Sequence, residues 1–220
     1  LDPQGHLTIG LGFSKKVPVT LKNMLENIVM GIKFDPREVI LHHEEGVDVI
    51  PSNKLLSGLE VSLIMAEDRE IILREYLMLL KEDYDFMIID CMPSLGMLTI
   101  NALTAADSVL IPMEPEYYAA DGLMELLKVY SAIKAKFNPD LKIEGIVFTF
   151  DTPTFNNSKR NKKAVISTYG DKIRIFKESI PRAVTIAETA SEGISIFAYD
   201  GSGKGAQSYQ KLVEGVLDHA

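Results

Sequence analysis

Asp90 has the setting in this sequence that most clearly indicates chemistry. It directly follows the apolar run Phe86–Ile89 and precedes a turn of small residues and a helical segment. An apolar strand that delivers one carboxylate at its end is a Walker-B arrangement, which places an acid where Mg²⁺ and phosphate meet. An Asp at the end of a strand is also a common helix N-cap, so this pattern alone leaves both interpretations open.

A basic cluster is the second feature that could do chemistry. The chain has a net charge of −8, which argues against a polyanion binder by composition alone. Between residues 155 and 185, however, eight Lys and Arg stand against two Asp and Glu, a local charge of +6. Its densest part is Lys159, Arg160, Lys162 and Lys163. Such a cluster either forms a solvated helix face or neutralises nucleic-acid phosphates, and the residues alone do not decide.

Three other patterns favour ordinary structural roles. Cys91 is the single cysteine, with no His or second Cys to form a site, so we interpret it as a packing residue. His42 and His43 are adjacent, which makes a shared metal awkward on a strand, and we interpret them as part of a solvated loop. The stretch Gly201–Gly205 resembles a phosphate-binding loop but lacks the first glycine and the final Ser or Thr, so we interpret it as a loop.

The elements that would position these residues indicate an α/β fold. Phe86–Ile89, Val109–Ile111 and Ile146–Phe148 lack polar alternation, which is typical of strands covered on both faces. Residues 47–50 and 173–176 are weaker strand candidates. We predict a doubly wound, mainly parallel sheet with helices on both faces, in one domain over residues 1–220.

Helices are predicted between these strands. A broad apolar stripe predicts a helix from Ala119 to Phe137, ended by Asn138 and Pro139, and residues 207–217 are predicted to form a terminal helix. No apolar stretch approaches the ~20 residues of a membrane span. A single cysteine fits a reducing cytoplasm.

Longer stretches of the sequence, in order, resemble the ParA/Soj family of partition ATPases, a deviant Walker group of P-loop proteins. Residues 90–107 resemble the family's switch-II segment, and residues 109–123 resemble the strand and helix after it. Residues 1–12 resemble switch I, and residues 180–188 and 198–209 resemble the C-terminal landmarks. The likeness therefore covers nearly all of the chain.

This resemblance implies a function in plasmid or chromosome partitioning. Members of the ParA/Soj family bind ATP and Mg²⁺ and hydrolyse ATP. They form an ATP-dependent homodimer and bind DNA without sequence preference. A ParB-type partner triggers hydrolysis, and the expected location is the cytoplasm, on the nucleoid. Two alternatives remain: a non-enzymatic ParA-like remnant that binds DNA or a partner, and a MinD-like ATPase acting on membranes. The second needs a basic amphipathic tail, which residues 207–220 do not supply.

The resemblance also implies roles for individual residues. Asp2 matches the switch-I aspartate that positions the attacking water, and Asp90 matches the Walker-B aspartate that holds Mg²⁺, usually through water. Pro181 and Arg182 match nucleotide-binding residues beside the base. The family's DNA binding favours the nucleic-acid interpretation of the basic cluster, Lys159, Arg160, Lys162 and Lys163.

The sequence departs from the family's pattern in four places. The phosphate loop, Lys-Gly-Gly-x-Gly-Lys-Thr/Ser, should precede Leu1, so we expect a chain that is incomplete at its N-terminus and does not hydrolyse ATP by itself. Its strand belongs beside the strand ending at Asp90, where we expect an exposed edge. Met92 stands where Pro is usual and Thr185 where Arg is common, and residues 149–154 lack the usual Asp-x-Arg.

Overall fold

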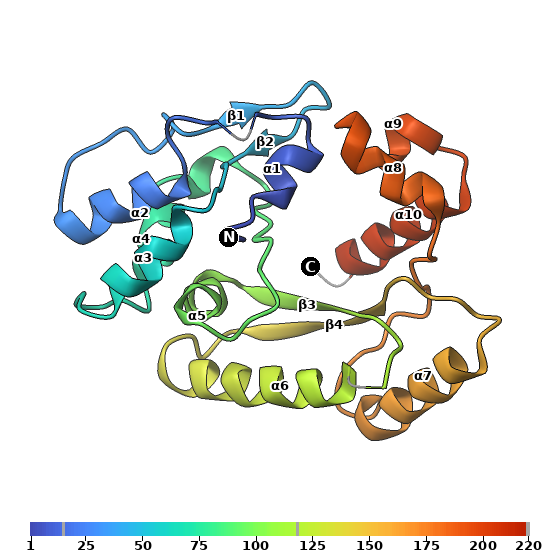
Figure 1. The fold of residues 1–220 in the computed structure, drawn as a ribbon. Coiled ribbons are helices and arrows are strands. Elements are labelled where there is room, and N and C mark those ends of the chain that lie inside the picture. Colours follow the sequence, from blue (N-terminus) through green and yellow to red (C-terminus); the bar gives the residue numbers. More distant parts are fainter. Residues whose placement is uncertain (15, 118, 219–220) are drawn as a thin grey trace. The chain divides into compact units, whose positions relative to one another are not determined.

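A computed structural model describes residues 1–14, 16–117 and 119–218. Tyr118, within the segment that resembles the family's strand and helix, and residues 219–220 of the tail lie outside the described residues. The helices are α1 (His6–Gly10), α2 (Leu21–Met30), α3 (Leu56–Leu63), α4 (Ile72–Met78), η1 (Lys81–Asp83), α5 (Met97–Ala105), α6 (Ala119–Lys136), α7 (Asn156–Tyr169), α8 (Val184–Glu192), α9 (Ile196–Asp200) and α10 (Lys204–Leu217) (Figure 1). The strands are β1 (Leu41–His42), β2 (Asp48–Val49), β3 (Ser108–Met113) and β4 (Lys142–Phe148).

The chain forms two compact units. Unit 1 comprises residues 1–106 and 129–140, and unit 2 comprises residues 107–128 and 141–220, so helix α6 contributes to both. The interpretation of residues 1–220 as one ATPase domain stays a prediction. None of the helices in the described part of the chain is long and apolar enough to cross a bilayer.

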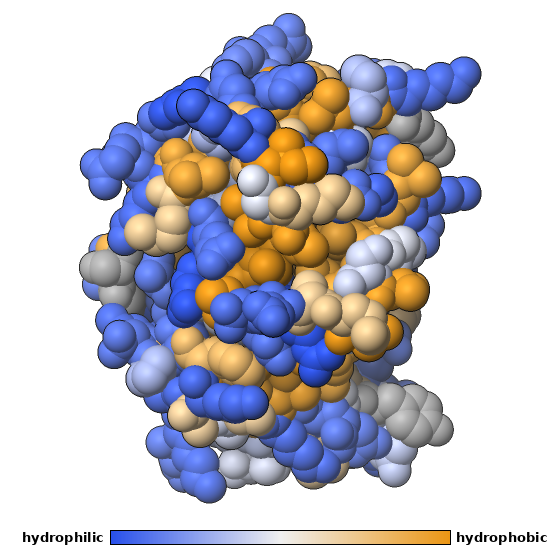
Figure 2. All heavy atoms as spheres, turned by 90° about the vertical axis from the view of Figure 1, so that its left-hand side faces the viewer, coloured by the Kyte–Doolittle hydropathy of each residue, from blue (hydrophilic) through white to orange (hydrophobic). Residues whose placement is uncertain are grey.

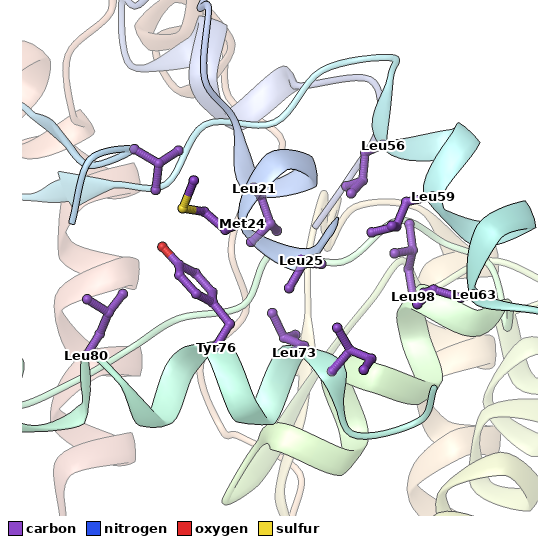
Figure 3. Packing of buried hydrophobic residues seen from close by; sticks show 12 residues of the cluster. Leu21, Met24, Leu25, Leu56, Leu59, Leu63, Leu73, Tyr76, Leu80 and Leu98 are labelled. Atoms are coloured by element: carbon purple, nitrogen blue, oxygen red, sulfur yellow. The ribbon is translucent and has the colours of Figure 1, made fainter. Parts of the chain in front are cut away.

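Unit 1 is built around a helical core. Leucines of α2, α3, α4 and α5 form one buried cluster with Met24 and with Tyr76, whose ring is fully buried (Figure 3). The Tyr76 hydroxyl donates a 2.9 Å hydrogen bond to the carbonyl of Pro36, so the polar end of this buried ring is satisfied. Buried Asn101 accepts from the Leu73 N–H at 3.0 Å and donates to the Arg69 carbonyl at 2.8 Å, which ties α5 to the start of α4.

Unit 2 contains the parallel strands. β3 and β4 pair from Ser108 opposite Lys142 to Met113 opposite Phe148. Single parallel bridges then join Ile146 to Ile175 and Asp151 to Pro181. The sheet is therefore parallel, as predicted, although residues 173–176 contribute a bridge rather than a full strand.

Helices cover both faces of these strands. On one face, the first part of α6 and helix α7 pack on Ile111, Ile146 and Phe148. On the other face, α8 and α10 pack on Val147 and Phe176. Figure 1 shows α6 and α7 on one side of β3 and β4, with α10 on the opposite side. Residues 107–128 and 141–220 thus have the layered α/β arrangement predicted from the alternating runs.

The apolar run before Asp90 is not a strand. Residues 86–90 carry no regular secondary structure, and Phe86, Met87 and Ile88 are exposed, Ile88 to 92%. The prediction of a strand buried on both faces was therefore wrong for this segment. The physical reason is that no strand among the described residues pairs with it, so its main-chain groups gain no ladder of hydrogen bonds. The expectation of an exposed sheet edge at this position stays a prediction.

Exposed apolar groups are frequent in unit 1. Figure 2 views the molecule from the side of α2 and α3 and shows hydrophobic side chains between hydrophilic ones. The exposed apolar residues of α3 and its ends include Leu55, Val61, Ile64 and Met65. Because α3 buries Leu56, Leu59 and Leu63, its apolar residues exceed what one buried face can accommodate.

The β1–β2 hairpin corrects the interpretation of His42. This residue lies in a short antiparallel strand opposite Asp48, not in a loop. Its Nδ1 is 2.6 Å from Asp48 Oδ1, and the Tyr84 hydroxyl donates to Asp48 Oδ2 at 2.7 Å. Burial and this hydrogen bond raise the pKa of Tyr84 to about 12. His42 therefore has a carboxylate partner.

Candidate functional site

The segments that carry Asp2 and Asp90 meet in unit 1. The main-chain nitrogen of Leu1 donates a 2.7 Å hydrogen bond to the carbonyl of Asp90, 89 positions away. The structure thus brings together two sequence-predicted residues that are distant in the chain. Both carboxylates lie on irregular backbone beside short helices, α1 after Asp2 and α5 after Asp90.

A tight turn holds Asp2. Its carboxylate accepts the Gln4 N–H at 2.8 Å and lies 3.5 Å from Nδ1 of His6, and its side chain is 16% exposed. Its carbonyl accepts the Gly5 N–H at 3.0 Å and the Ser52 hydroxyl at 2.7 Å. These bonds fix the direction of the Asp2 side chain.

Gly5 is required in this turn. Its φ is +66°, and a Cβ there would lie 2.5 Å from the Ser52 carbonyl oxygen. The Ser52 N–H also donates to the Thr8 hydroxyl at 3.1 Å, so Ser52 holds the segment that carries Asp2 at two points. Sequence reasoning missed Ser52, because a serine far along the chain carries no signal for this contact.

Asp90 is exposed, and the described residues offer its carboxylate no hydrogen-bond or ion-pair partner. After it, the Ser94 N–H donates to the Met92 carbonyl at 2.8 Å, and the chain enters α5. The N-cap alternative is not observed, since Gly96 is the N-cap of α5. Within the described ranges, no group of three or more His, Cys, Asp or Glu side chains is placed to hold a metal ion.

Pro181 and Arg182 lie in unit 2, next to the end of β4. The Arg182 guanidinium lies 5.2 Å from the centre of the Phe150 ring and 3.6 Å from the Glu114 carboxylate. Phe150 is half-exposed and has a φ of +49°, which is strained for an aromatic residue. Sequence reasoning did not select Phe150 or Glu114, although Glu114 directly follows β3 and Phe150 lies two residues after β4. The Arg182 side chain, directly after Pro181, thus contacts both an aromatic ring and a carboxylate.

Asp151 forms a buried polar network beside Pro181. It is 4% exposed, and its carboxylate accepts hydrogen bonds of 2.8 Å from both Lys162 and Ser158. Lys162 also donates to the Ser179 hydroxyl at 2.9 Å. Burial acts to raise the pKa of Asp151, but the hydrogen bonds and the charge of Lys162 outweigh it and lower that pKa. Asp151 therefore stays ionised and paired.

The basic cluster lies on α7 but does not share one environment. Lys159 and Lys163 are exposed and line a hollow of about 290 Å³. Arg160 is exposed and lines a separate hollow of about 350 Å³ together with Glu116 and Asp121. Lys162 is only 26% exposed and is paired with Asp151. The cluster therefore offers three exposed cations, and the ion pair of Lys162 was not indicated by the sequence.

Of two weaker patterns, the loop at Gly201–Gly205 agrees with the sequence, whereas Cys91 is exposed and not the packing residue that we expected. Gly201, Ser202 and Gly203 form a turn, and the carboxylate of Asp200 already lies against Gly203 at the start of α10, where a phosphate would have to approach. Although Cys91 as a residue is exposed, burial around its thiol raises the pKa of that thiol, which favours the protonated, unreactive form.

Comparison with known proteins finds a family model and several relatives that match this chain. The model of the AAA domain family AAA_31 matches residues 1–143. The chain is 40% identical to the sporulation initiation inhibitor protein Soj of Bacillus subtilis over 220 residues, covering 98% of this chain and 83% of Soj. It is also 40% identical to the chromosome partitioning protein ParA of Myxococcus xanthus over 215 residues, covering 96% of this chain and 73% of ParA.

A solved structure has the same fold. The cobyrinic acid a,c-diamide synthase of Mycobacterium smegmatis, with bound ADP and magnesium, superposes with a TM-score of 0.83 at 32% identity. The match covers 99% of this chain and 79% of that protein.

The fold is that of the P-loop NTPases, an α/β class with mainly parallel strands and helices on both faces. Within this class the identities over nearly the whole chain decide the family. The chain belongs to the ParA/Soj family of partition ATPases.

Proposed function

We propose that this protein is an ATP-driven switch for the segregation of plasmids or chromosomes. In this role it binds and hydrolyses Mg·ATP, and it forms a dimer when ATP is bound. It binds DNA without sequence preference, and this binding locates it on the nucleoid. A ParB-type partner triggers hydrolysis. The observation that carries the proposal is the contact between the Asp2 and Asp90 segments, in a chain 40% identical to Soj.

Asp90 is proposed to hold Mg²⁺. Mg²⁺ keeps several waters and usually takes one or two carboxylates plus substrate phosphates, so it needs no cage of protein ligands. A single exposed carboxylate without a described partner fits that chemistry. When bound, the ion would neutralise phosphate charge.

Asp2 is proposed to orient the attacking water. Its Oδ1 is fixed by the Gln4 N–H, which keeps the side chain in one orientation. Phosphoryl transfer needs positioned water and charge neutralisation more than covalent help, and one oriented carboxylate supplies the first of these. The support from Ser52 beneath the turn serves the same purpose.

Pro181 and Arg182 are proposed to contact the nucleotide base. Their position beyond the end of β4 is where ligands bind in sheets of this class. Arg182 beside the exposed ring of Phe150 offers flat surfaces suited to an aromatic base. The strained φ of Phe150 is consistent with a residue kept for function rather than stability.

Lys159, Arg160 and Lys163 are proposed to contact DNA phosphates. All three are exposed on one helix within a locally basic stretch. Contacts to phosphate carry no sequence information, which agrees with non-specific binding. DNA contact by Lys162 stays a prediction, one that its pairing with Asp151 disfavours.

The test is a comparison of phosphate release and DNA binding for the protein expressed from its complete gene and for the 220-residue chain alone. We expect the complete protein to hydrolyse ATP slowly and to bind non-specific duplex only with ATP. We expect no turnover from the 220 residues, because they contain no loop of backbone N–H groups and lysine to meet the phosphates. DNA binding without any ATP binding by the complete protein would favour the non-enzymatic alternative.

A further inference from the structure

We propose that the Asp151–Lys162 ion pair positions residues 180–182 for the nucleotide base, so that Lys162 acts as a positioning residue and not as a DNA contact. The inference rests on the proposed role of Pro181 and Arg182. It concerns residues of unit 2 only, and it arises from a buried ion pair that the proposed chemistry does not otherwise use.

The main chain of Asp151 brackets Pro181. The Asp151 N–H donates to the Ile180 carbonyl at 3.0 Å, and the Asp151 carbonyl accepts the Arg182 N–H at 3.2 Å. Pro181 has no N–H of its own, so it depends on its two neighbours for attachment to the sheet. Any movement of Asp151 is therefore passed to the residues on both sides of Pro181.

The Lys162 ammonium supplies a second attachment. It donates to Asp151 at 2.8 Å and to the Ser179 hydroxyl at 2.9 Å, and Ser179 directly precedes Ile180. Ser158, also on α7, donates to the other oxygen of the Asp151 carboxylate at 2.8 Å. The segment is thus held by the main chain of Asp151 and, through Lys162, by helix α7.

This attachment is strong because it is charged and sheltered. Asp151 is 4% exposed, and hydrogen bonds between ionised groups are about twice as strong as neutral ones. Removing the charge of Lys162 leaves the carboxylate with neutral side-chain partners, the hydroxyls of Ser158 and Ser179. Residues 179–182 then gain freedom, and a nucleotide must order them when it binds, which lowers its affinity.

The position on α7 gives the pair a second consequence. Lys159 and Lys163 flank Lys162 on the same helix and line the hollow that Asp151 also lines. The ion pair therefore joins the proposed base-contacting segment to the helix of the proposed DNA contacts.

The test compares Lys162→Gln with Lys159→Gln in the protein expressed from its complete gene. Both variants remove one positive charge from α7, but only Lys162 is paired with Asp151 in the described structure. The dissociation constants of Mg·ATP and of Mg·tripolyphosphate, which has no base or sugar, are measured for each. We expect Lys162→Gln to weaken ATP binding about tenfold and tripolyphosphate binding less than about twofold, with neither affinity changed by Lys159→Gln.

The salt dependence of DNA binding is measured for the same two variants, Lys162→Gln and Lys159→Gln. The slope of log affinity against log salt falls by about 1 for each lost phosphate contact. We expect Lys159→Gln to reduce the slope by about 1 and Lys162→Gln to leave it unchanged. A reduced slope in Lys162→Gln with unchanged ATP affinity would make Lys162 a DNA contact and overturn the inference.

Three further outcomes are decisive. Equal loss of ATP and tripolyphosphate binding in Lys162→Gln would indicate general damage and overturn the positioning role. If that variant does not fold, Lys162→Arg carries the test: it keeps the charge with a different reach, and we expect ATP binding alone to weaken, whereas no change would overturn the proposal. A parent protein that binds neither ligand would reject the proposed function and this inference with it.

Discussion

Similar apolar sequences have different secondary structure and burial in the two units. Phe86–Ile89 in unit 1 and Ile146–Phe148 in unit 2 are both continuous apolar runs. Ile146 is fully buried in β4, between β3 and the segment that contains Ile175. Ile88 is 92% exposed, in a segment that pairs with no strand among the described residues. The difference shows that an apolar run becomes a strand only where neighbouring main chain can pair with it.

The carboxylates of the two units differ in the same way. Asp90 in unit 1 is exposed and has no partner in the described structure, whereas Asp151 in unit 2 is buried and bonded to Lys162 and Ser158. A carboxylate of the first kind is available to a metal ion. One of the second kind is committed to holding the structure together.

The largest expected effect concerns catalysis by the two carboxylates of unit 1, Asp2 and Asp90. In the protein expressed from its complete gene, Asp2→Ala should lower phosphate release about 10³-fold while ATP-dependent DNA binding is kept, because the water loses its orientation but the phosphates keep their contacts. Asp90→Ala should instead weaken Mg²⁺-dependent nucleotide binding. Full turnover by Asp2→Ala would show that the site is wrongly assigned.

Paired truncations of the two apolar runs should give the next largest difference. In the 220-residue chain, Ile146→Ala should lower the free energy of unfolding by about 3 kcal/mol, because it leaves a cavity in a packed core. Ile88→Ala should change it by less than about 0.5 kcal/mol, because its side chain is already in water. Urea denaturation measures both, and equal losses would mean that residues 86–89 are buried in solution.

A charge-reversal comparison tests the proposed DNA face. Replacing Lys159, Arg160 and Lys163 with Glu should weaken non-specific duplex binding about thirtyfold at moderate salt. The same change in overall charge at exposed lysines of unit 1, Lys33, Lys54 and Lys81, should weaken it less than about threefold. Fluorescence anisotropy with labelled duplex measures both variants. Similar losses would mean that net charge, not α7, controls binding.

The smallest expected effect concerns pH. The pKa of Asp151 is lowered in the folded state, so its contribution to stability is present above its ordinary value of about 3.9 and is lost as the pH falls through the folded value. Unfolding followed from pH 6 to pH 2 should show that Asp151→Asn lacks this part of the acid-induced loss. Asp90→Asn is the matched control for removing one carboxylate. A profile for Asp151→Asn identical to that of the parent would contradict the prediction.

Much of the local structure was predictable from the sequence. The runs at residues 109–111 and 146–148 gave the parallel strands β3 and β4, and the apolar stripe after Ala119 gave α6, which ends just before Asn138 and Pro139. The predicted terminal helix is present but begins at Lys204, three residues earlier than expected, because Gly203 serves as its N-cap. Periodicity and breaker residues determine such elements locally.

The sequence indicated several candidate site residues but not the contacts that they make in the folded chain. Asp2 and Asp90 could be selected from their motifs, but Ser52, which supports Asp2, could not, because its contact depends on chain folding over 50 positions. Lys162 was grouped with three neighbouring cations because composition cannot distinguish a paired lysine from a free one. Its partner Asp151 lies 11 positions away, on the far side of a turn.

The sequence by itself determined the α/β alternation, the family, and the carboxylates and cations that could act on a nucleotide or on DNA, since these depend on residue type and spacing. Only the tertiary structure decided which apolar run is buried, which carboxylate is free and which lysine is paired. The physical reason is that burial and pairing are properties of neighbours brought together by the fold, and the same Asp or Ile acts differently according to what lies against it.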